Sequence, residues 1–261
     1  MELSFHYHDV IDSTNTEIRR LMPTGIPEGY VVSCGEQTAG KGRSGHNWES
    51  PPGVSVATSI ALYPKGLSDI VLPRLTIIAA VAVAEAVEEL YDLPTEIKWP
   101  NDILISKKKI CGILTERLTE DMPASGGGVP VIVGIGVNVH HRTFSDEIAD
   151  KATSLDLELI AAGRDCSITS RRDVAESIWR HFEPHYRGFV DRGGSLLDIL
   201  DMYNSRLVST GERVRVLDPR GEYEGTCVRM DESGRLEVMT DSGLRLIDSG
   251  EVSVRGIYGY V

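Results

Sequence analysis

Residues 73–91, PRLTIIAAVAVAEAVEELY, carry the clearest helical pattern in this chain of 261 residues. Apolar residues recur there at α-helical spacing, and a proline near the start is tolerated because the first helical N–H groups need no partner. The most apolar part, residues 75–84, is too short to span a bilayer, which needs roughly 20 apolar residues. The stretch therefore predicts a helix buried in the core of a globular protein.

Short β-like runs flank this helix on both sides. A helix is also expected to start at residues 12–15, where Thr14 and Glu17 have the spacing of a capping box. A glycine-rich hairpin loop is expected at 125–128. We expect strands at 5–10, 29–34, 54–63, 95–99, 103–105, 109–117 and 129–139, and helices at 171–190 and 195–207.

The pattern changes near Gly211, where five short β-like runs separated by turn residues begin. They cover residues 213–217, 223–230, 235–240, 244–248 and 251–255. Meandering strands of this size indicate a small barrel-like unit. We therefore expect two domains, residues 1–208 and residues 209–261.

Net charge and cysteine spacing exclude several functional classes. The net charge is −12, so no global basic field attracts nucleic acid or a membrane, and an anionic ligand needs a local cluster of Lys and Arg. The four cysteines are far apart and lack the spacing of a zinc site, which indicates reduced thiols in a cytoplasmic protein. The first ten residues lack the pattern of a signal peptide.

A glycine-rich loop at residues 40–45, GKGRSG, matches two phosphate-binding motifs only superficially. The dinucleotide motif needs a helix that begins on the loop, and residues 47–53 cannot start one. A P-loop needs Ser or Thr where Gly42 stands. The loop still places Lys41 and Arg43 beside glycines that admit a ligand, which favours binding of a carboxylate or phosphate over a merely solubilising surface loop.

Three further segments are unusual for purely structural sequence. Residues 98–102, KWPND, predict a rigid polar corner, although a β-turn with a packed Trp would look the same. Lysines 107–109 suit a solvated hairpin tip or a cation placed before a buried strand. Asn138 ends the strand-like run GIGVN, at residues 134–138, which otherwise suggests an edge strand or a bulge.

Together these segments resemble the catalytic domain of biotin protein ligases. The order is DSTN at 12–15, QTAGKGRSG at 37–45 with Trp48, KWPND at 98–102, KICGILTE at 109–116 and GIGVN at 134–138. The resemblance implies an ATP-dependent ligase that forms biotinyl-5'-AMP and transfers biotin to a lysine of a biotin carboxyl carrier protein. A lipoate-type acyl ligase on the same scaffold and a non-enzymatic binding module are the alternatives.

The resemblance also assigns roles to residues. Lys109, Arg43 and Lys98 would be the catalytic cations, because charge accumulates when a carboxylate joins an anionic α-phosphate. Mg²⁺ would enter on ATP, without a protein ligand that the sequence identifies. The biotin-binding set would be Ser13, Thr14, Asn15, Gln37, Lys41, Gly42, Arg43, Lys109 and Gly112, and the ATP-binding set Arg43, Trp48, Asn101, Lys109 and Asn138.

The implied fold is α+β, with a mixed and mainly antiparallel sheet like that of class II synthetases, followed by an SH3-like β-barrel. Lys41 departs from the commoner Arg of the family's loop and loses its bidentate geometry. The motifs begin within the first fifteen residues, so we expect a monofunctional ligase without the DNA-binding domain of some members. Whether it forms a homodimer stays open.

Overall fold

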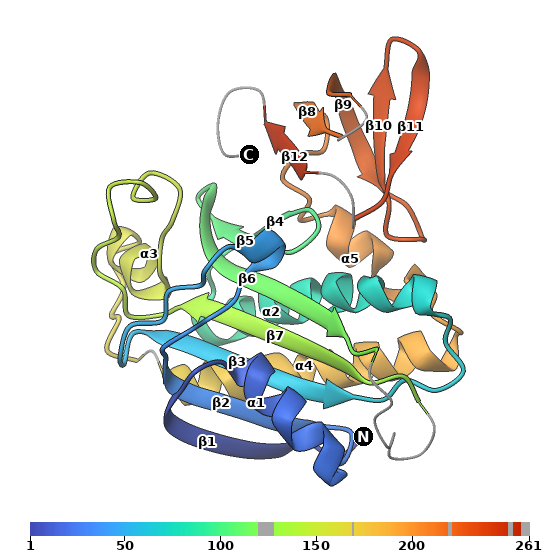
Figure 1. Ribbon diagram of the computed structural model, residues 1–261. Coiled ribbons are helices and arrows are strands. Elements are labelled where there is room, and N and C mark those ends of the chain that lie inside the picture. The colour runs from blue at the N-terminus through green and yellow to red at the C-terminus, as the bar shows by residue number, and fades with distance from the viewer. Residues whose placement is uncertain (120–127, 169, 219–220, 250–252, 257–261) are drawn as a thin grey trace.

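The computed structural model describes residues 1–119, 128–168, 170–218, 221–249 and 253–256, which form two β-sheets with helices packed on the larger one (Figure 1). The strands are β1 Ser4–Ile11, β2 Tyr30–Gln37, β3 Ser55–Leu62, β4 Glu96–Lys98, β5 Asp102–Ile105, β6 Lys108–Arg117, β7 Val131–Asn138, β8 Arg213–Leu217, β9 Tyr223–Met230, β10 Leu236–Thr240, β11 Gly243–Ile247 and β12 Ser253–Gly256. The α-helices are α1 Thr14–Leu21, α2 Leu75–Tyr91, α3 Leu155–Ala161, α4 Arg171–Asp191 and α5 Leu200–Asn204.

The larger sheet has the strand order β1-β2-β3-β7-β6-β5-β4. Only the β1–β2 pair is parallel among its strand pairs in the described residues, so the expected mixed, mainly antiparallel sheet is confirmed. Helices α2 and α4 pack against each other on one face, and α1 crosses β2, β3 and β7 on the other (Figure 1). The cavity described below opens on the α1 face.

Helix α2 is the core helix that its sequence pattern predicts. Twelve of its seventeen residues are buried, and a 3₁₀ turn, Asp69–Arg74, leads into it. The continuous segment Asp69–Tyr91 is long and apolar enough to cross a membrane, but 67% of its most apolar window is buried inside the fold. A helix enclosed by its own protein satisfies the same length and composition test, so the interpretation as a core helix stands.

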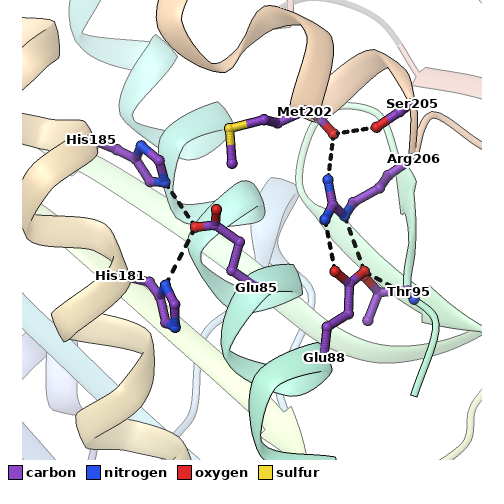
Figure 2. A network of polar contacts seen from close by, with 8 residues as sticks. All are labelled: Glu85, Glu88, Thr95, His181, His185, Met202, Ser205 and Arg206. Atoms are coloured by element: carbon purple, nitrogen blue, oxygen red, sulfur yellow. Dashed lines mark hydrogen bonds and ion pairs between the residues drawn. The ribbon is translucent and has the colours of Figure 1, made fainter. Parts of the chain in front are cut away.

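Ion pairs at the edge of the helix layer tie α4 and the α5 region to α2 (Figure 2). His181 and His185, one turn apart on α4, both face Glu85, at 3.6 and 2.8 Å. Glu88 accepts two hydrogen bonds from Arg206, at 3.0 and 2.7 Å. Burial alone would raise the pKa of Glu88, but Arg206 and Thr95 together hold it below its ordinary value.

The C-terminal sheet is antiparallel with the order β11-β10-β9-β8-β12, and it fits the predicted SH3-like unit. Strands β8 and β9 begin and end where the sequence predicted, and β10 and β11 differ by one residue at their ends. Strand β12 ends one residue later than predicted, and residues 251–252 of that prediction lie outside the described residues. Alternation along β8 buries Val214 and Val216 and exposes Arg213 and Arg215. This period of two residues is expected of a strand with one buried face, whereas the C-terminal strands were predicted from the turn residues that separate short β-like runs.

Several local predictions were wrong. Ser13, not Thr14, is the N-cap of α1, and it makes no side-chain cap bond. Strand β7, which carries Asn138, is central rather than at an edge, because it lies between β3 and β6. The sequence reasoning also missed α3, although Ser154 caps it and Asp156 lies in its first turn. The predicted hairpin loop at 125–128 lies outside the described residues except for its last residue.

Candidate active site

A cavity lies between the start of α1, the glycine-rich loop, the KWPND corner and strands β6 and β7. It gathers all but two of the predicted site residues, although they come from distant parts of the sequence. Its lining comprises Ser13, Thr14, Asn15, Gln37, Lys41, Gly42, Arg43, Trp48, Asn101, Lys109, Gly112, Ile113, Leu114, Gly134, Ile135 and Gly136.

The α1 end of the cavity is a fixed polar array. Gln37 Oε1 accepts from the main-chain N–H of Thr14 at 2.8 Å and from its hydroxyl at 3.2 Å. The buried hydroxyl of Ser59 lies 2.6 Å from both Thr14 Oγ1 and Asn15 Oδ1 and can donate its one proton to either, and Asn15 Nδ2 donates to Glu116 Oε2 at 2.6 Å. Such an array suits a small ligand with N–H donors and a carbonyl acceptor.

The sequence reasoning missed Ser59 and Glu116 as members of this array. Ser59 belongs to β3, in which every residue is buried, so a hydroxyl there needs a partner. Glu116 ends the KICGILTE motif and also pairs with Arg19 at 2.9 Å. A polar residue inside an otherwise buried strand was the signal that could have identified Ser59, and for Glu116 the signal was its place at the end of the KICGILTE motif.

Glycines form the floor of the cavity because ring atoms lie directly on the sheet. Gly112 and Gly136 are opposite each other in the β6–β7 register. A Cβ on Gly136 would lie 2.4 Å from the Trp48 ring, and one on Gly112 would lie 3.0 Å from it. Neither position therefore accepts a side chain while Trp48 lies there. Among the described residues the buried indole N–H of Trp48 has no hydrogen-bond partner.

The other end of the cavity holds two linked cations. Lys109 Nζ pairs with Asp102 Oδ1 at 2.7 Å, and Arg43 donates to Asn101 Oδ1 at 2.7 Å. Asn101 in turn donates to Asp102 Oδ1 at 3.0 Å, so the KWPND corner holds both cations. Arg43 also donates to the carbonyl of Ser249, beyond β11, at 2.6 Å. Asp102 was quoted in the motif without a predicted role.

The arginine sits in a partly dehydrated position. Burial lowers the pKa of the Arg43 guanidinium below its ordinary value, and the carboxylate of Asp102 opposes that shift. Lys109 Nζ lies 5.6 Å from the centroid of the Trp48 ring, whereas Lys41 is exposed at the rim. Dehydrated cations interact strongly with an anion that enters beside them. The local cationic cluster that an acidic chain requires is therefore present.

Two predicted residues, Lys98 and Asn138, are not among the described residues that line the cavity. Lys98 ends β4, opposite Asp102 in the β4–β5 register. Asn138 is buried, and its amide donates to the carbonyl of Thr153 at 3.1 Å. The geometry gives Asn138 a structural role in holding the segment before α3. The ligand roles of both residues remain predictions.

The glycine-rich loop folds over the cavity as a short hairpin. Gly42 N–H donates to the carbonyl of His46 at 2.7 Å, and Trp48 N–H donates to that of Gly40 at 3.0 Å. A single 3₁₀ turn, Arg43–Gly45, precedes β3. The loop therefore lacks the helix on which a dinucleotide motif or P-loop depends, as the sequence indicated.

We expect this loop to be protected from hydrogen exchange when its ligands bind. Amides of residues 41–48 should exchange more slowly with biotin and ATP present, because the ligands fill the space under the loop. The tip of the β10–β11 hairpin, at the far end of the molecule in Figure 1, is the internal control. Exchange in the loop that is unchanged by both ligands would contradict its role as a lid.

A buried histidine, His141, lies near the segment that follows the glycine-rich loop. His141 is 9% exposed and stacks on Phe144 with ring centroids 5.1 Å apart. Its Nδ1 has no hydrogen-bond partner in the described part of the chain. Burial lowers the pKa of His141 below its ordinary value, although the carboxylate of Glu49 opposes the shift. The folded state therefore favours the neutral imidazole.

This lowered pKa predicts acid sensitivity. The unfolded chain takes up the His141 proton near its ordinary pKa of about 6.5, before the folded chain does. Stability should thus be complete above that pH and decrease by up to about 1 kcal/mol per pH unit below it. His141→Phe should flatten the slope of unfolding free energy between about pH 7.5 and pH 5.5. Equal slopes in urea titrations of both proteins would contradict this assignment.

The cavity offers few ligands for a metal ion. No group of three His, Cys, Asp or Glu side chains among the described residues is arranged to hold one. At the end of the cavity that holds the two cations, the side-chain oxygens of Asp102 and Asn101 already contact Lys109 and Arg43. A Mg²⁺ ion that arrives with a nucleotide would be held largely by the phosphates, as is common for this ion.

Comparisons with known proteins agree with this geometry. The sequence profile of the Biotin/lipoate A/B protein ligase family matches residues 7–138, and that of the Biotin protein ligase C terminal domain matches residues 210–255. The chain is 37% identical to the Bifunctional ligase/repressor BirA of Bacillus subtilis over 253 residues, which is 95% of this chain and 73% of that protein.

Two other proteins are similar over nearly their whole length. The Biotin–[acetyl-CoA-carboxylase] ligase of Paracoccus denitrificans is 29% identical, with 94% of this chain and 98% of that protein covered. A biotin protein ligase from Aquifex aeolicus, solved in complex with biotin and ATP, superimposes with a TM-score of 0.81 at 30% identity. That superposition covers 97% of this chain and 98% of the other.

Proposed function

This chain belongs to the biotin/lipoate A/B protein ligase family. From that membership we propose how its cavity performs the ligase reaction. It is an ATP-dependent ligase that activates biotin as biotinyl-5'-AMP and transfers biotin to a protein lysine. The observation that carries the proposal is that one cavity joins a polar array on α1 to a pair of cations on the KWPND corner and β6.

The polar array is the site for biotin's ureido ring. A ureido group has two N–H donors and one carbonyl acceptor, which match the amide and hydroxyl groups of Ser13, Thr14, Asn15 and Gln37. Thr14 and Asn15 need little reorganisation because Ser59 and Glu116 already hold them, and Gln37 is bonded to Thr14. The acyl chain would then run over the Gly112–Gly136 floor beside Trp48 and bring the carboxylate to Arg43 and Lys109.

Arg43 and Lys109 lower the barrier to adenylation. An oxygen of the biotin carboxylate attacks the α-phosphorus of ATP, and the bond to diphosphate breaks. Two anions must approach in this step, so cations placed beforehand stabilise the charge that accumulates on the phosphoryl oxygens. Asp102 keeps the Lys109 ammonium directed into the cavity through their 2.7 Å ion pair.

The second step uses the same centre. The neutral amine of the carrier lysine attacks the acyl carbonyl of the adenylate, the acyl–phosphate bond breaks to release AMP, and the nitrogen loses one proton to solvent as the amide forms. Arg43 and Lys109 stabilise the negative charge on the phosphate of the departing AMP, as they stabilised the charge on the α-phosphate in the first step. The partner is therefore a biotin carboxyl carrier protein or domain, as the name of the Paracoccus enzyme implies.

We also propose the domain division and the setting in which the enzyme works. Residues 1–208 form the catalytic domain and residues 209–261 the C-terminal domain, which the profile match at 210–255 supports. The widely separated cysteines favour a cytoplasmic ligase, and the net charge of −12 argues against a role in DNA binding. A homodimer is compatible with this proposal and is tested by light scattering.

Biotin-dependent exchange between ATP and labelled diphosphate tests the activity directly. We expect exchange with biotin and ATP–Mg²⁺, and little with lipoate, because a dithiolane ring presents no N–H donors to the polar array. Incubation with a carrier domain followed by intact mass measurement then tests the transfer. Exchange that responds to lipoate but not to biotin would favour the lipoate-type alternative.

A further inference from the structure

The KWPND corner, which connects β4 to β5, faces the cavity with Asn101 and Asp102 but is anchored from behind. The indole of Trp99 is 4% exposed. Its Nε1–H donates to the carbonyl of Gly234 at 3.0 Å, across 135 residues of sequence. Gly234 lies in the turn between β9 and β10, so this bond joins the corner to the C-terminal sheet.

The accepting turn is itself rigid. Asp231 Oδ1 accepts from the main-chain N–H groups of Ser233 and Arg235, both at 2.9 Å, and Asp231 Oδ2 pairs with the Arg235 guanidinium at 2.7 Å. Gly234 has a φ of +80°, and a Cβ there would lie 3.3 Å from Leu196. The turn therefore presents the Gly234 carbonyl in one orientation, packed against the catalytic part of the chain.

We propose that the β9–β10 turn positions the activation site by holding Trp99, and that Trp99 is a positioning residue for adenylation. The inference rests on the proposed function and adds to it. The chain of contacts runs from Gly234 to Trp99, along the backbone to Asn101 and Asp102, and from these to Arg43 and Lys109. The C-terminal sheet thus helps to fix the positions of Arg43 and Lys109 through the KWPND corner.

The position of the Trp99–Gly234 hydrogen bond in the fold predicts which kinetic constant changes when the bond is lost. A displacement of the corner by a fraction of an ångström misaligns both cations with the reacting groups, and catalysis is sensitive to such errors. The polar array for biotin lies on α1, β2, β3 and the Glu116 end of β6, and its hydrogen bonds run among these elements rather than to the corner. Loss of the Trp99 bond should therefore lower kcat while the KM for biotin changes little.

The chain contains a matched control for this experiment. Trp179 on α4 is also buried, and its indole N–H donates to Thr58 Oγ1 at 2.8 Å. Thr58 and Ser59 are neighbours in β3, so their side chains face opposite sides of the sheet, and Ser59 faces the cavity. Trp99→Phe and Trp179→Phe thus remove the same group and the same type of bond.

We expect both variants to melt at a lower temperature, and only Trp99→Phe to lower kcat for biotin-dependent diphosphate exchange, by about tenfold. Its KM for biotin should stay within about twofold of wild type, and Trp179→Phe should keep both constants within about twofold. Asp231→Ala, which disrupts the turn but keeps Trp99, should lower kcat similarly. Combined with Trp99→Phe it should add little, because both changes break one connection.

The outcomes separate this inference from the proposed function. Wild-type protein without biotin-dependent exchange would reject the function itself. Active wild-type protein whose two Trp→Phe variants lose kcat equally, or whose Trp99→Phe variant keeps it, would overturn the inference. If Trp99→Phe does not fold, Asp231→Ala with wild-type kcat overturns it equally.

Discussion

Lys109→Ala is expected to lower the rate of biotinyl-adenylate formation about a hundredfold while measurable biotin binding remains. Removal of one preplaced donor to a developing oxyanion costs about 3 kcal/mol in the transition state. Lys109 is the cation that Asp102 holds in the cavity at 2.7 Å, whereas the proposed site for biotin's ring is the array on α1. The loss should therefore appear in kcat for diphosphate exchange.

The adjacent lysine provides the control for Lys109→Ala. Lys108 precedes it in β6 and is not among the cavity-lining residues that the structure describes. Lys108→Ala removes the same side chain and charge, and it should retain nearly the wild-type rate. Wild-type exchange rates in Lys109→Ala, or equal losses in both variants, would overturn the assignment of Lys109.

Gly134→Ala is the second change with a large expected effect. A Cβ at this position would lie 2.0 Å from Asn15 Oδ1 and 2.8 Å from its Cγ. Asn15 is 5% exposed and held by Ser59 and Glu116, so it cannot move aside freely. The variant should bind biotin about a hundredfold more weakly, since misplacing a buried, hydrogen-bonded amide costs about 1–3 kcal/mol.

Isothermal titration with biotin measures this loss, and Gly188→Ala is the control. Gly188 lies within α4, where a Cβ would meet only Asp198 Oδ2, at 3.2 Å. Alanine there should bind biotin like wild type, and alanine favours a helix by about 1 kcal/mol over glycine. If Gly134→Ala bound biotin with wild-type affinity, Asn15 would not belong to the biotin site.

Local sequence signals were sufficient for most of the fold. Helix α2, the strands of both sheets and the change of pattern near residue 211 follow periodicities and turn residues that act over a few neighbours. The errors occur where tertiary contacts override a local preference. Thr14, for example, is the first residue of helix α1, and its hydroxyl bonds to Gln37 at the end of β2 instead of capping the helix.

The residue types of the site were also evident in the sequence. An acidic chain that concentrates Lys41, Arg43 and Lys109 beside glycines indicates an anion site, and the ordered motifs of the family specify its chemistry. The sequence by itself thus predicted which side chains form the candidate site. It could not determine which partners hold them, because the charge and size of a residue do not reveal its neighbours across the sheet.

Only the tertiary structure decided those partnerships. The β6–β7 register places Gly112 opposite Gly136 under Trp48, and the packing of two sheets brings Gly234 to Trp99. Asp102 reaches Lys109 through the β5–β6 pairing, while Asn138 bonds to Thr153 outside the cavity. Contacts between residues far apart in sequence depend on register and close packing of the whole fold, and no local pattern encodes them.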